Sequence, residues 1–233
     1  MRRVQLLAIA MVVLALAVSV GGRRNAVSRQ ESTETIPGDP VTDFDGNAYR
    51  TVTIGDQVWM AENLRSTHYR DGSPIAYYEY DRNPDNARTY GRLYSSSAVM
   101  RGEASSNGVP SGVRGIAPRG WHVPSRAEWE KLAGSLGGAG IAGGKLKEKG
   151  TGHWLAPNAG ATDESRFTAL PAGMHDFTGI FQWIGDRAVF ATSTANTGQN
   201  GVAAIVLFSL GTTLEIGNFH PDDAYSVRCV KDH

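Results

Sequence analysis

Two turn signals placed close together constrain the fold of this chain more than any other feature of the sequence. Asp45-Gly46 precedes the run 49–54, in which branched apolar residues alternate with threonines, and Gly55-Asp56 follows that run. An Asp-Gly pair between alternating apolar residues is a strong short-range signal of a β-hairpin. The sequence therefore predicts two consecutive hairpins, the second of them formed with residues 57–60.

Composition also favours a globular domain rich in turns. The 233 residues include 28 Gly and 10 Pro, a pattern that does not suit a helical bundle. Lys and Arg number 23, as do Asp and Glu, and removing Arg2 and Arg3 leaves 21 cations against 23 anions, a charge of −2. This balance argues against nucleic acid as a partner. The single cysteine excludes an intramolecular disulfide and a zinc site built on several thiolates.

The beginning of the chain has the pattern of a secretory signal. Arg2 and Arg3 precede an apolar run from Leu6 to Val20, and residues 17–19 form a plausible cleavage tripeptide. An uncleaved anchor helix is the alternative, but the run is shorter than the roughly 20 residues that a bilayer span prefers. Residues 1–22 are therefore predicted to be a signal peptide or N-terminal anchor. The rest of the chain is expected outside the cytoplasm, as a secreted, periplasmic or cell-surface protein.

The next segment, 23–40, is polar, has no period and ends in prolines, so it is predicted to be a flexible tether. The remaining residues, 41–233, have the length of one domain. Any contact with a membrane is expected only through residues 1–22, if they are not cleaved. The sequence does not predict the oligomeric state.

The clearest helix is predicted over about 125–136. Ser125 and Glu128 form a Ser-x-x-Glu capping box, and Trp129 begins a series of apolar residues at helical spacing. Strands are predicted over 202–210, which is continuously apolar, and over 225–230, which alternates. Strands at both ends of the domain with a helix between them indicate an α+β fold with short antiparallel strands and long loops.

Three segments, 45–64, 120–129 and 225–232, together resemble the Fibrobacter succinogenes major paralogous domain. The resemblance implies a bacterial extracytoplasmic domain of a family with no assigned enzymatic activity. It also implies a fold similar to the C-type-lectin-like and formylglycine-generating folds, and fold alone does not carry function. The motif residues expected to be structural are Trp59, Glu62, Asn63, Trp121, His122, Pro124, Ser125, Glu128, Trp129, Arg228 and Cys229.

One departure from the family pattern concerns its cysteines. Members often have a cysteine before the Pro-x-Gly-Trp-His motif, where this chain has Ala117. The resemblance therefore implies that Cys229 lacks the partner with which it pairs in relatives. An intermolecular bond through Cys229 is left open.

Three oxygen-bearing residues in the first turn are a weak candidate for calcium. Asp43, Asp45 and Asn47 supply the hard oxygen ligands that Ca²⁺ prefers, but no bidentate glutamate follows at the spacing of a calcium loop. A hairpin turn stabilised by its own side chains is the alternative interpretation. No other cofactor is expected.

No set of residues has the spacing of a catalytic or metal site. The six histidines are scattered, and no Gly-x-Ser-x-Gly elbow is present. His122 is interpreted as a buried structural histidine, and Cys229 as an inert thiol on a core-facing position. No catalytic residue is therefore predicted.

Two aromatic groups are candidates for a binding surface. Tyr77, Tyr78 and Tyr80 could present rigid contact area to a ligand, and an ordinary strand with one aromatic face is the alternative. Trp183 with Asp186 and Arg187 forms the second group.

These features predict a secreted or surface-exposed, non-catalytic binding or adhesion module whose ligand is a glycan or a protein. One alternative is a secreted hydrolase acting on cell-wall or plant polysaccharide, which requires a cleft that joins Glu128 or Asp163 to a histidine. A structural surface module without a discrete ligand is the other.

Overall fold

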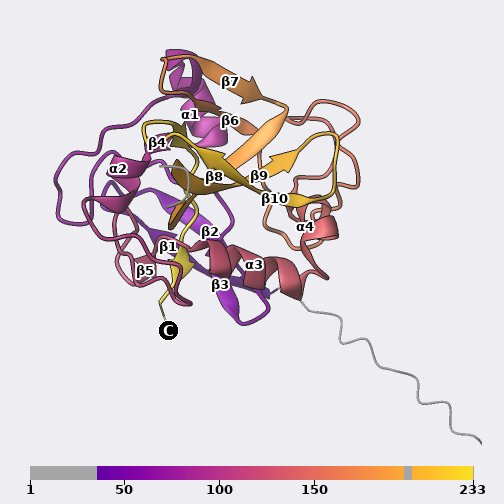
Figure 1. The fold of residues 1–233 in the computed structure, drawn as a ribbon, viewed down its shortest axis with the longest axis horizontal. Helices are drawn as coiled ribbons and strands as arrows, with labels where there is room; N and C mark the ends of the chain where they lie inside the picture. The colour runs from indigo at the N-terminus through magenta and orange to yellow at the C-terminus, as the bar shows by residue number, and fades with distance from the viewer. Residues whose placement is uncertain (1–35, 197–200, 233) are drawn as a thin grey trace, which may run out of the picture. The chain divides into compact units, whose positions relative to one another are not determined.

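A computed structural model describes residues 36–196 and 201–232. Within these ranges the chain forms two sheets joined by long loops and short helices (Figure 1). The predicted signal or anchor, and the part of the predicted tether up to residue 35, lie outside the described residues. In the part of the chain that is described, no helix has the length and apolar character needed to cross a bilayer.

The first sheet contains both predicted hairpins. Its strands, in spatial order, are β1 (Ile36–Thr42), β2 (Ala48–Ile54), β3 (Gln57–Met60), β12 (Val230–Lys231) and β5 (Trp121–His122). All neighbours in this sheet are antiparallel. The two hairpins are confirmed, and the last strand lies directly beside them, as predicted.

The first strand begins inside the segment predicted as a tether. β1 starts at Ile36, and its register with β2 shifts between Gly38 and Val41. Proline cannot donate to a ladder, and it is tolerated in a strand at the edge of a sheet. β1 is such an edge strand, so its prolines at positions 37 and 40 hid the strand from a pattern-based prediction.

The second sheet is larger and carries the longest strands. Its main path runs β10 (Leu214–Phe219), β9 (Gly201–Phe208), β8 (Arg187–Asn196), β6 (Ala172–His175), β11 (Ala224–Tyr225) and β4 (Tyr94–Ser95), and β7 (Phe181–Ile184) pairs with β6. Only β6 and β8 are parallel, through Gly173 and Ala188. β9 is buried at nearly every position, which confirms the strand predicted from its apolar run.

Four α-helices and one 3-10 helix are present in the described ranges. They are η1 (Tyr80–Arg82), α1 (Pro84–Tyr90), α2 (Ser96–Met100), α3 (Arg126–Ser135) and α4 (Ala139–Leu146). The helix predicted over 125–136 is α3, and both hydrogen bonds of its capping box form between Ser125 and Glu128. The architecture is α+β with mostly antiparallel strands, as predicted.

An aromatic cluster joins α3 to both sheets. The Trp129 ring on α3 lies 4.6 Å from the Trp59 ring on β3 and 5.3 Å from the Phe190 ring on β8. Phe167 makes edge-on contacts with all three rings. None of the four side chains has exposed surface, so their burial is a main source of stability for the domain.

The single strand predicted over 225–230 is wrong, because this segment is divided between the two sheets. β11 pairs with β4 and β6 in the second sheet, whereas β12 pairs with β3 and β5 in the first. Between them the chain is covered on both sides, and even Ser226 and Arg228 are only 1% exposed. The alternation in the sequence therefore marks a buried crossing between two sheets.

Candidate binding site

The three tyrosines of the first candidate surface do not lie on a regular strand. Tyr78 is held by a pair of backbone hydrogen bonds with Leu93, each 2.9 Å long, and the chain then turns into η1. Tyr77 and Tyr78 remain 38% and 39% exposed, whereas Tyr80 is only 6% exposed and packs 5.1 Å from the Phe181 ring. Tyr80 therefore belongs to the core beneath the surface, and the predicted trio is reduced to two exposed rings.

These two rings line a cavity of about 260 Å³ that we call the aromatic pocket. Its lining residues are Tyr77, Tyr78, Glu79, Arg82, His175 and Phe181. His175 ends β6 and Phe181 begins β7, so the second sheet supplies one wall and the loop before η1 supplies the other. The Tyr78 ring stacks on the His175 ring at 3.9 Å and 15°, and the Phe181 ring meets His175 edge-on at 4.7 Å.

His175 is the unusual member of the aromatic pocket. It is 9% exposed, and its Nδ1 has no hydrogen-bond partner among the described residues. Burial lowers the pKa of its imidazole, so the ring is neutral at pH 7. Buried polar atoms normally have a partner, and leaving one without costs ~1–3 kcal/mol. Nδ1 is itself buried, so a ligand in the cavity would contact the aromatic rings and not this atom.

The charged residues beside the pocket fix its tyrosine wall. Arg92 donates to the Glu79 carboxylate over 2.9 Å and 3.2 Å, and its guanidinium lies 4.5 Å from the centre of the Tyr77 ring. Arg92 also donates to the carbonyl of Arg65. Tyr77 is thus held in place by a cation–π contact before any ligand binds.

The backbone next to the pocket is strained. Asp81 and Arg82 both have positive φ, at 55° and 56°. Residues other than glycine adopt this left-handed conformation at a cost, and such positions gather at functional sites. Arg82 is one of the residues that line the aromatic pocket.

The second candidate group comes together at a separate place. The Arg187 guanidinium on β8 lies 4.0 Å from the centre of the Trp183 ring on β7 and 5.1 Å from that of Phe208. Asp186 accepts hydrogen bonds from Ser209 Oγ at 2.5 Å and from Arg187 Nε at 3.2 Å. The predicted residues are therefore neighbours, but their charged groups are engaged with one another, and none of them lines the aromatic pocket.

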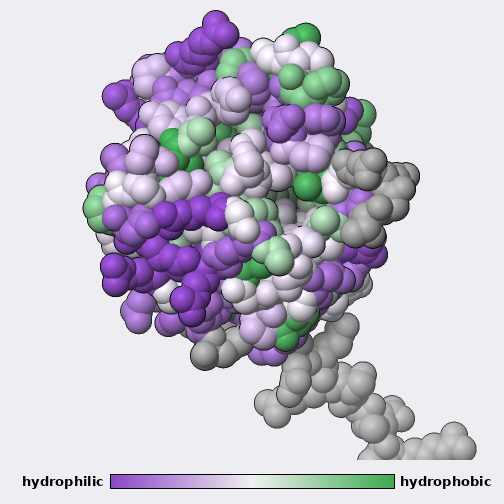
Figure 2. Space-filling view, turned by 60° about the vertical axis from the view of Figure 1, so that its left-hand side comes forward, coloured by the Kyte–Doolittle hydropathy of each residue, from purple (hydrophilic) through white to green (hydrophobic). Residues whose placement is uncertain are grey.

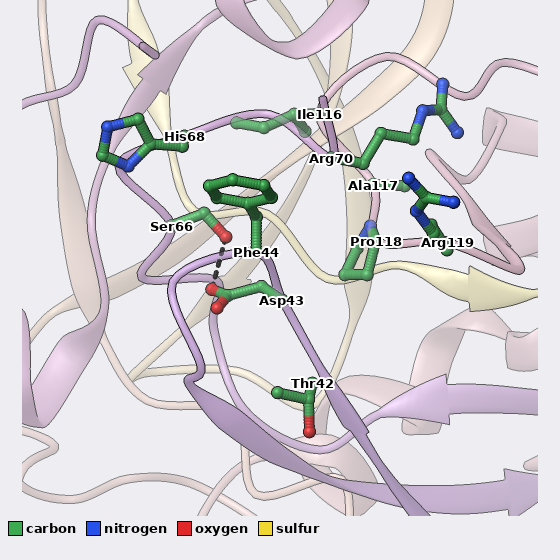
Figure 3. A pocket seen from close by; sticks show the side chains of 10 residues that line it. All are labelled: Thr42, Asp43, Phe44, Ser66, His68, Arg70, Ile116, Ala117, Pro118 and Arg119. Carbon is green, nitrogen blue, oxygen red and sulfur yellow. Dashed lines mark hydrogen bonds between the residues drawn. The ribbon is translucent and has the colours of Figure 1, made fainter. Parts of the chain in front are cut away.

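Figure 3 shows a second cavity, of about 140 Å³, beside the first hairpin. Phe44 stands in its middle and is 58% exposed, with His68 on one side and Arg70 and Arg119 on the other. Asp43, the first of the calcium candidates, also lines this cavity.

Hydrogen bonds from the protein occupy the Asp43 carboxylate. Ser66 Oγ donates to it over 2.5 Å (Figure 3). Tyr49 Oη donates over 2.6 Å, and Asn47 donates through its backbone and side-chain nitrogens over 2.9 Å each. Asn47 therefore points its amide at Asp43 as a donor. This arrangement supports the interpretation of these residues as a turn.

Asp45 is bonded in the same way. It accepts from the backbone nitrogens of Thr67 and His68 and lies 2.6 Å from His68 Nδ1. Burial alone would raise the pKa of the Asp45 carboxyl, but these hydrogen bonds lower it. Across residues 36–196 and 201–232, no group of three or more His, Cys, Asp or Glu side chains is arranged to hold a metal ion.

A buried histidine flanked by two carboxylates is the arrangement that most resembles catalytic chemistry. His122 Nε2 lies 2.8 Å from Glu128 Oε1, and His122 Nδ1 lies 2.8 Å from Asp232 Oδ1. Burial alone would lower the pKa of His122, but the hydrogen bonds to Glu128 and Asp232 raise it. His122 and Glu128 are 1% and 2% exposed, so a substrate has no access to the pair.

Asp163, the other carboxylate that the hydrolase alternative requires beside a histidine, has a different partner. Asp163 accepts from the backbone and the hydroxyl of Thr168, and burial raises the pKa of its carboxyl. In the described ranges, no hydrogen bond or ion pair joins Asp163 to a histidine.

Residues 52–231 match the model of the Fibrobacter succinogenes major domain. The chain belongs to this family. Neither a curated protein nor a solved structure matches it. Membership assigns neither an activity nor a ligand, and the C-type-lectin-like architecture stays a prediction.

Most motif residues by which the chain resembles the Fibrobacter succinogenes major domain are buried and structural. The segment that leads into α3 contains Trp121, His122, Pro124 and Ser125, and all four side chains are buried. Glu62 accepts a hydrogen bond from the backbone nitrogen of Arg50 on β2 over 2.6 Å. These contacts agree with the structural role predicted for them.

Cys229 is likewise part of the core. It has no exposed surface, is not in a disulfide, and belongs to the same hydrophobic cluster as Ala117. Burial raises the pKa of its thiol far above the ordinary value. Its predicted inertness follows from these surroundings.

Sequence reasoning missed His175 and Arg82 as members of the site. His175 ends a short strand with no distinctive pattern, and its contact with Tyr78 depends on sheet pairing between segments far apart in the chain. The only local signal was the aromatic residue at position 181, six residues after His175 on the partner strand of the hairpin.

Proposed function

We propose that this domain is a non-catalytic, extracytoplasmic binding module that takes a glycan in the aromatic pocket. The segment 1–22 supports export, and the pocket supports recognition. A sugar ring presents an apolar face of C–H groups together with hydroxyls. A pocket that combines aromatic faces with a few polar groups complements both kinds of surface.

The Tyr78–His175 stack carries this proposal. The stack holds two rings rigid at the pocket, which reduces the entropy lost when a ligand binds. The Phe181 ring, which lies edge-on to His175, adds a third aromatic side chain to the same pocket. The strained backbone at Asp81 and Arg82 supports the same location.

A glycan fits the surface better than an apolar protein partner does. On the face in Figure 2, apolar residues (green) form separate spots among polar residues (purple). Protein interfaces that depend on burial usually present a continuous apolar patch. Outside the aromatic pocket, the exposed apolar side chains of the described residues are scattered over the chain, from Phe44 to Ile216.

The hydrolase alternative is not favoured by the geometry. Glu128 does meet a histidine, but both are sealed in the core. The structural-module alternative gives no role to the exposed Tyr77 and Tyr78 rings, which are fixed in place without a ligand. Measured turnover of a polysaccharide by the purified protein would reverse the first of these judgements.

A glycan array that also carries bacterial surface proteins tests the proposal. The exported protein is applied as wild type, as Tyr78→Ala and as Phe177→Ala, the last being an aromatic that is 61% exposed and outside the pocket. The expected result is binding to glycans that Tyr78→Ala weakens at least ~10-fold, equivalent to ~1.4 kcal/mol, with Phe177→Ala unchanged. Blank glycan spots, or binding that survives Tyr78→Ala, would contradict the proposal.

Export is tested separately. We propose that residues 1–22 direct the domain across a membrane and are removed. The intact mass of the protein recovered outside the cytoplasm should correspond to a chain that begins near residue 20. Recovery of the full-length chain from the cytosol would contradict this part of the proposal.

A further inference from the structure

Arg228 is a buried cation without an ion-pair partner in the described ranges. Its residue is 1% exposed, and its guanidinium lies 4.2 Å from the centre of the Phe167 ring. Nε donates to Asn63 Oδ1 over 2.7 Å, and the two terminal nitrogens donate to the carbonyls of Phe167 and Thr168. A guanidinium carries five N–H donors, so these three bonds leave two donors for another acceptor.

Burying a charge without an opposite charge is expensive. The effective penalty is several kcal/mol for an ion that is not paired. Burial accordingly lowers the pKa of Arg228 to about 9, and Asp163 and Glu62 attract its charge only from beyond ion-pair distance. The arrangement is incomplete as it stands, because the strongest available compensation, a carboxylate on the guanidinium, is missing.

Arg228 lines a cavity of about 180 Å³, which we call the arginine pocket. The charged residues that line it are Arg50, Arg65, Arg88, Arg228, Glu62 and Glu148. Four cations thus face two anions.

The two anions are already engaged. Glu62 lies 3.8 Å from Arg50 Nε, and Glu148 lies 2.8 Å from His153 Nδ1. The Arg65 guanidinium donates to the Ala48 carbonyl over 3.2 Å and lies 4.9 Å from the centre of the Tyr49 ring. Two guanidinium groups of the pocket, those of Arg65 and Arg228, therefore have no carboxylate partner among the described residues.

A purely structural role explains part of this arrangement. Three of the donors of Arg228 fix the loop at 167–168 against Asn63, which is reason enough to bury the side chain. That role does not explain why Arg65 lines the same cavity without a counter-charge. A ligand that brings a negative charge would pair with Arg65 and also offset the buried positive charge of Arg228 beneath it.

The arginine pocket and the aromatic pocket both share lining residues with a third cavity. Arg65 and Arg88 line the arginine pocket and also this third cavity, and Glu79 lines the third cavity together with the aromatic pocket. A polymer that passes over the third cavity would reach both pockets.

We propose that the arginine pocket is a subsite for a carboxylate of an acidic glycan. Planar guanidinium groups match the planar, two-oxygen geometry of a carboxylate and bind it with paired hydrogen bonds. This inference rests on the proposed function, since it identifies the class of glycan that the same surface takes.

Two ligands of equal length test the subsite. Calorimetric titration of the full chain with a galacturonate oligomer and with the matching neutral galactose oligomer should give at least 10-fold tighter binding of the acidic one. Arg65→Gln should remove most of that preference. Arg126→Gln, an exposed arginine paired with Glu130 on α3, is the matched control and should leave the preference unchanged. Equal affinities for the two oligomers, or a preference that survives Arg65→Gln, would overturn the inference.

A second measurement separates the subsite from the proposed function. Monomeric sodium galacturonate should raise the melting temperature above that in sodium chloride of equal ionic strength, and Arg65→Gln should abolish the rise. If this shift appears while no oligomer binds, the subsite stands and the proposed function fails. If oligomers bind through Tyr78 but the shift is absent in wild type, the function stands and the subsite is wrong. Stabilisation by sodium sulfate alone, without any by galacturonate, would overturn the assignment to carboxylate.

Discussion

Arg228 Nε donates to Asn63 Oδ1 over 2.7 Å, although the two residues lie 165 positions apart in the chain. The bond joins the segment that crosses between the two sheets to the residues that follow β3. Asn63 in turn donates through Nδ2 to the carbonyl of Tyr90 and to Ser226 Oγ, so one amide connects three distant segments. This buried network lies beside the arginine pocket and holds the end of α1 next to it.

Replacing Arg228 with methionine should destabilise the domain strongly. The substitution leaves Asn63 Oδ1 and the carbonyls of Phe167 and Thr168 without their donor, at ~1–3 kcal/mol for each buried acceptor. We expect the free energy of unfolding in urea to fall by about 3 kcal/mol or more. A double-mutant cycle with Asn63→Ala should give a coupling of ~0.5–3 kcal/mol, and strictly additive effects would contradict the network.

The stability of the domain should depend on pH through His122. Hydrogen bonds to Glu128 and Asp232 raise its folded-state pKa above the unfolded value, which is about 6.5. The stabilisation is therefore complete below that unfolded value and is lost as the pH rises through the folded pKa. Urea unfolding of wild type and His122→Asn between pH 5 and 9 isolates this contribution, because other groups cancel in the difference. A difference that is constant with pH, or that grows toward alkaline pH, would show the assignment to be wrong.

Replacing Gly91 with alanine should destabilise the domain more than the same replacement at Gly102. Its φ is +79°, and an added Cβ would lie 2.6 Å from the Cβ of Asn63 and 3.0 Å from the Leu64 carbonyl oxygen. Gly102 has the same φ of +79° but nothing within 4 Å of an added Cβ. Gly102→Ala should cost ~1–2 kcal/mol from backbone strain, and Gly91→Ala at least ~1 kcal/mol more, from the clash and from a ψ of −175° that is open essentially only to glycine. Equal melting temperatures for the two variants would be the contrary result.

Cys229 should react only when the domain unfolds. It is the one cysteine in the sequence, it has no exposed surface, and burial raises the pKa of its thiol. We expect no measurable labelling by a thiol reagent in native buffer and one label per chain in concentrated urea. Rapid labelling of the native protein at neutral pH would mean that the last segment opens far more readily than its burial implies.

Local signals predicted the elements that depend on local chemistry. The turns at Asp45-Gly46 and Gly55-Asp56 and the capping box of Ser125 each involve residues a few positions apart, so their geometry is written in short stretches of sequence. The short helices α1, α2 and α4 were not predicted, since none has enough turns to build a clear apolar period.

The site was harder to predict because it depends on distant pairing. Tyr77 and Tyr78 were identified as surface aromatics, but the burial of Tyr80 is decided by Phe181, and the stack on Tyr78 by His175. Neither contact leaves a trace in the residues next to the tyrosines. The surroundings of Arg228 likewise depend on distant pairing, because the crossing between the two sheets buries its side chain.

The location of the ligand is tested most directly by the histidine side chains themselves. The glycan that binds most tightly on the array is titrated into protein labelled with ¹⁵N at its histidines, and the imidazole resonances are followed. We predict that the His175 signals shift with saturation while those of buried His122 stay in place. Unmoved His175 resonances at saturating glycan would contradict the claim that the aromatic pocket is the binding site.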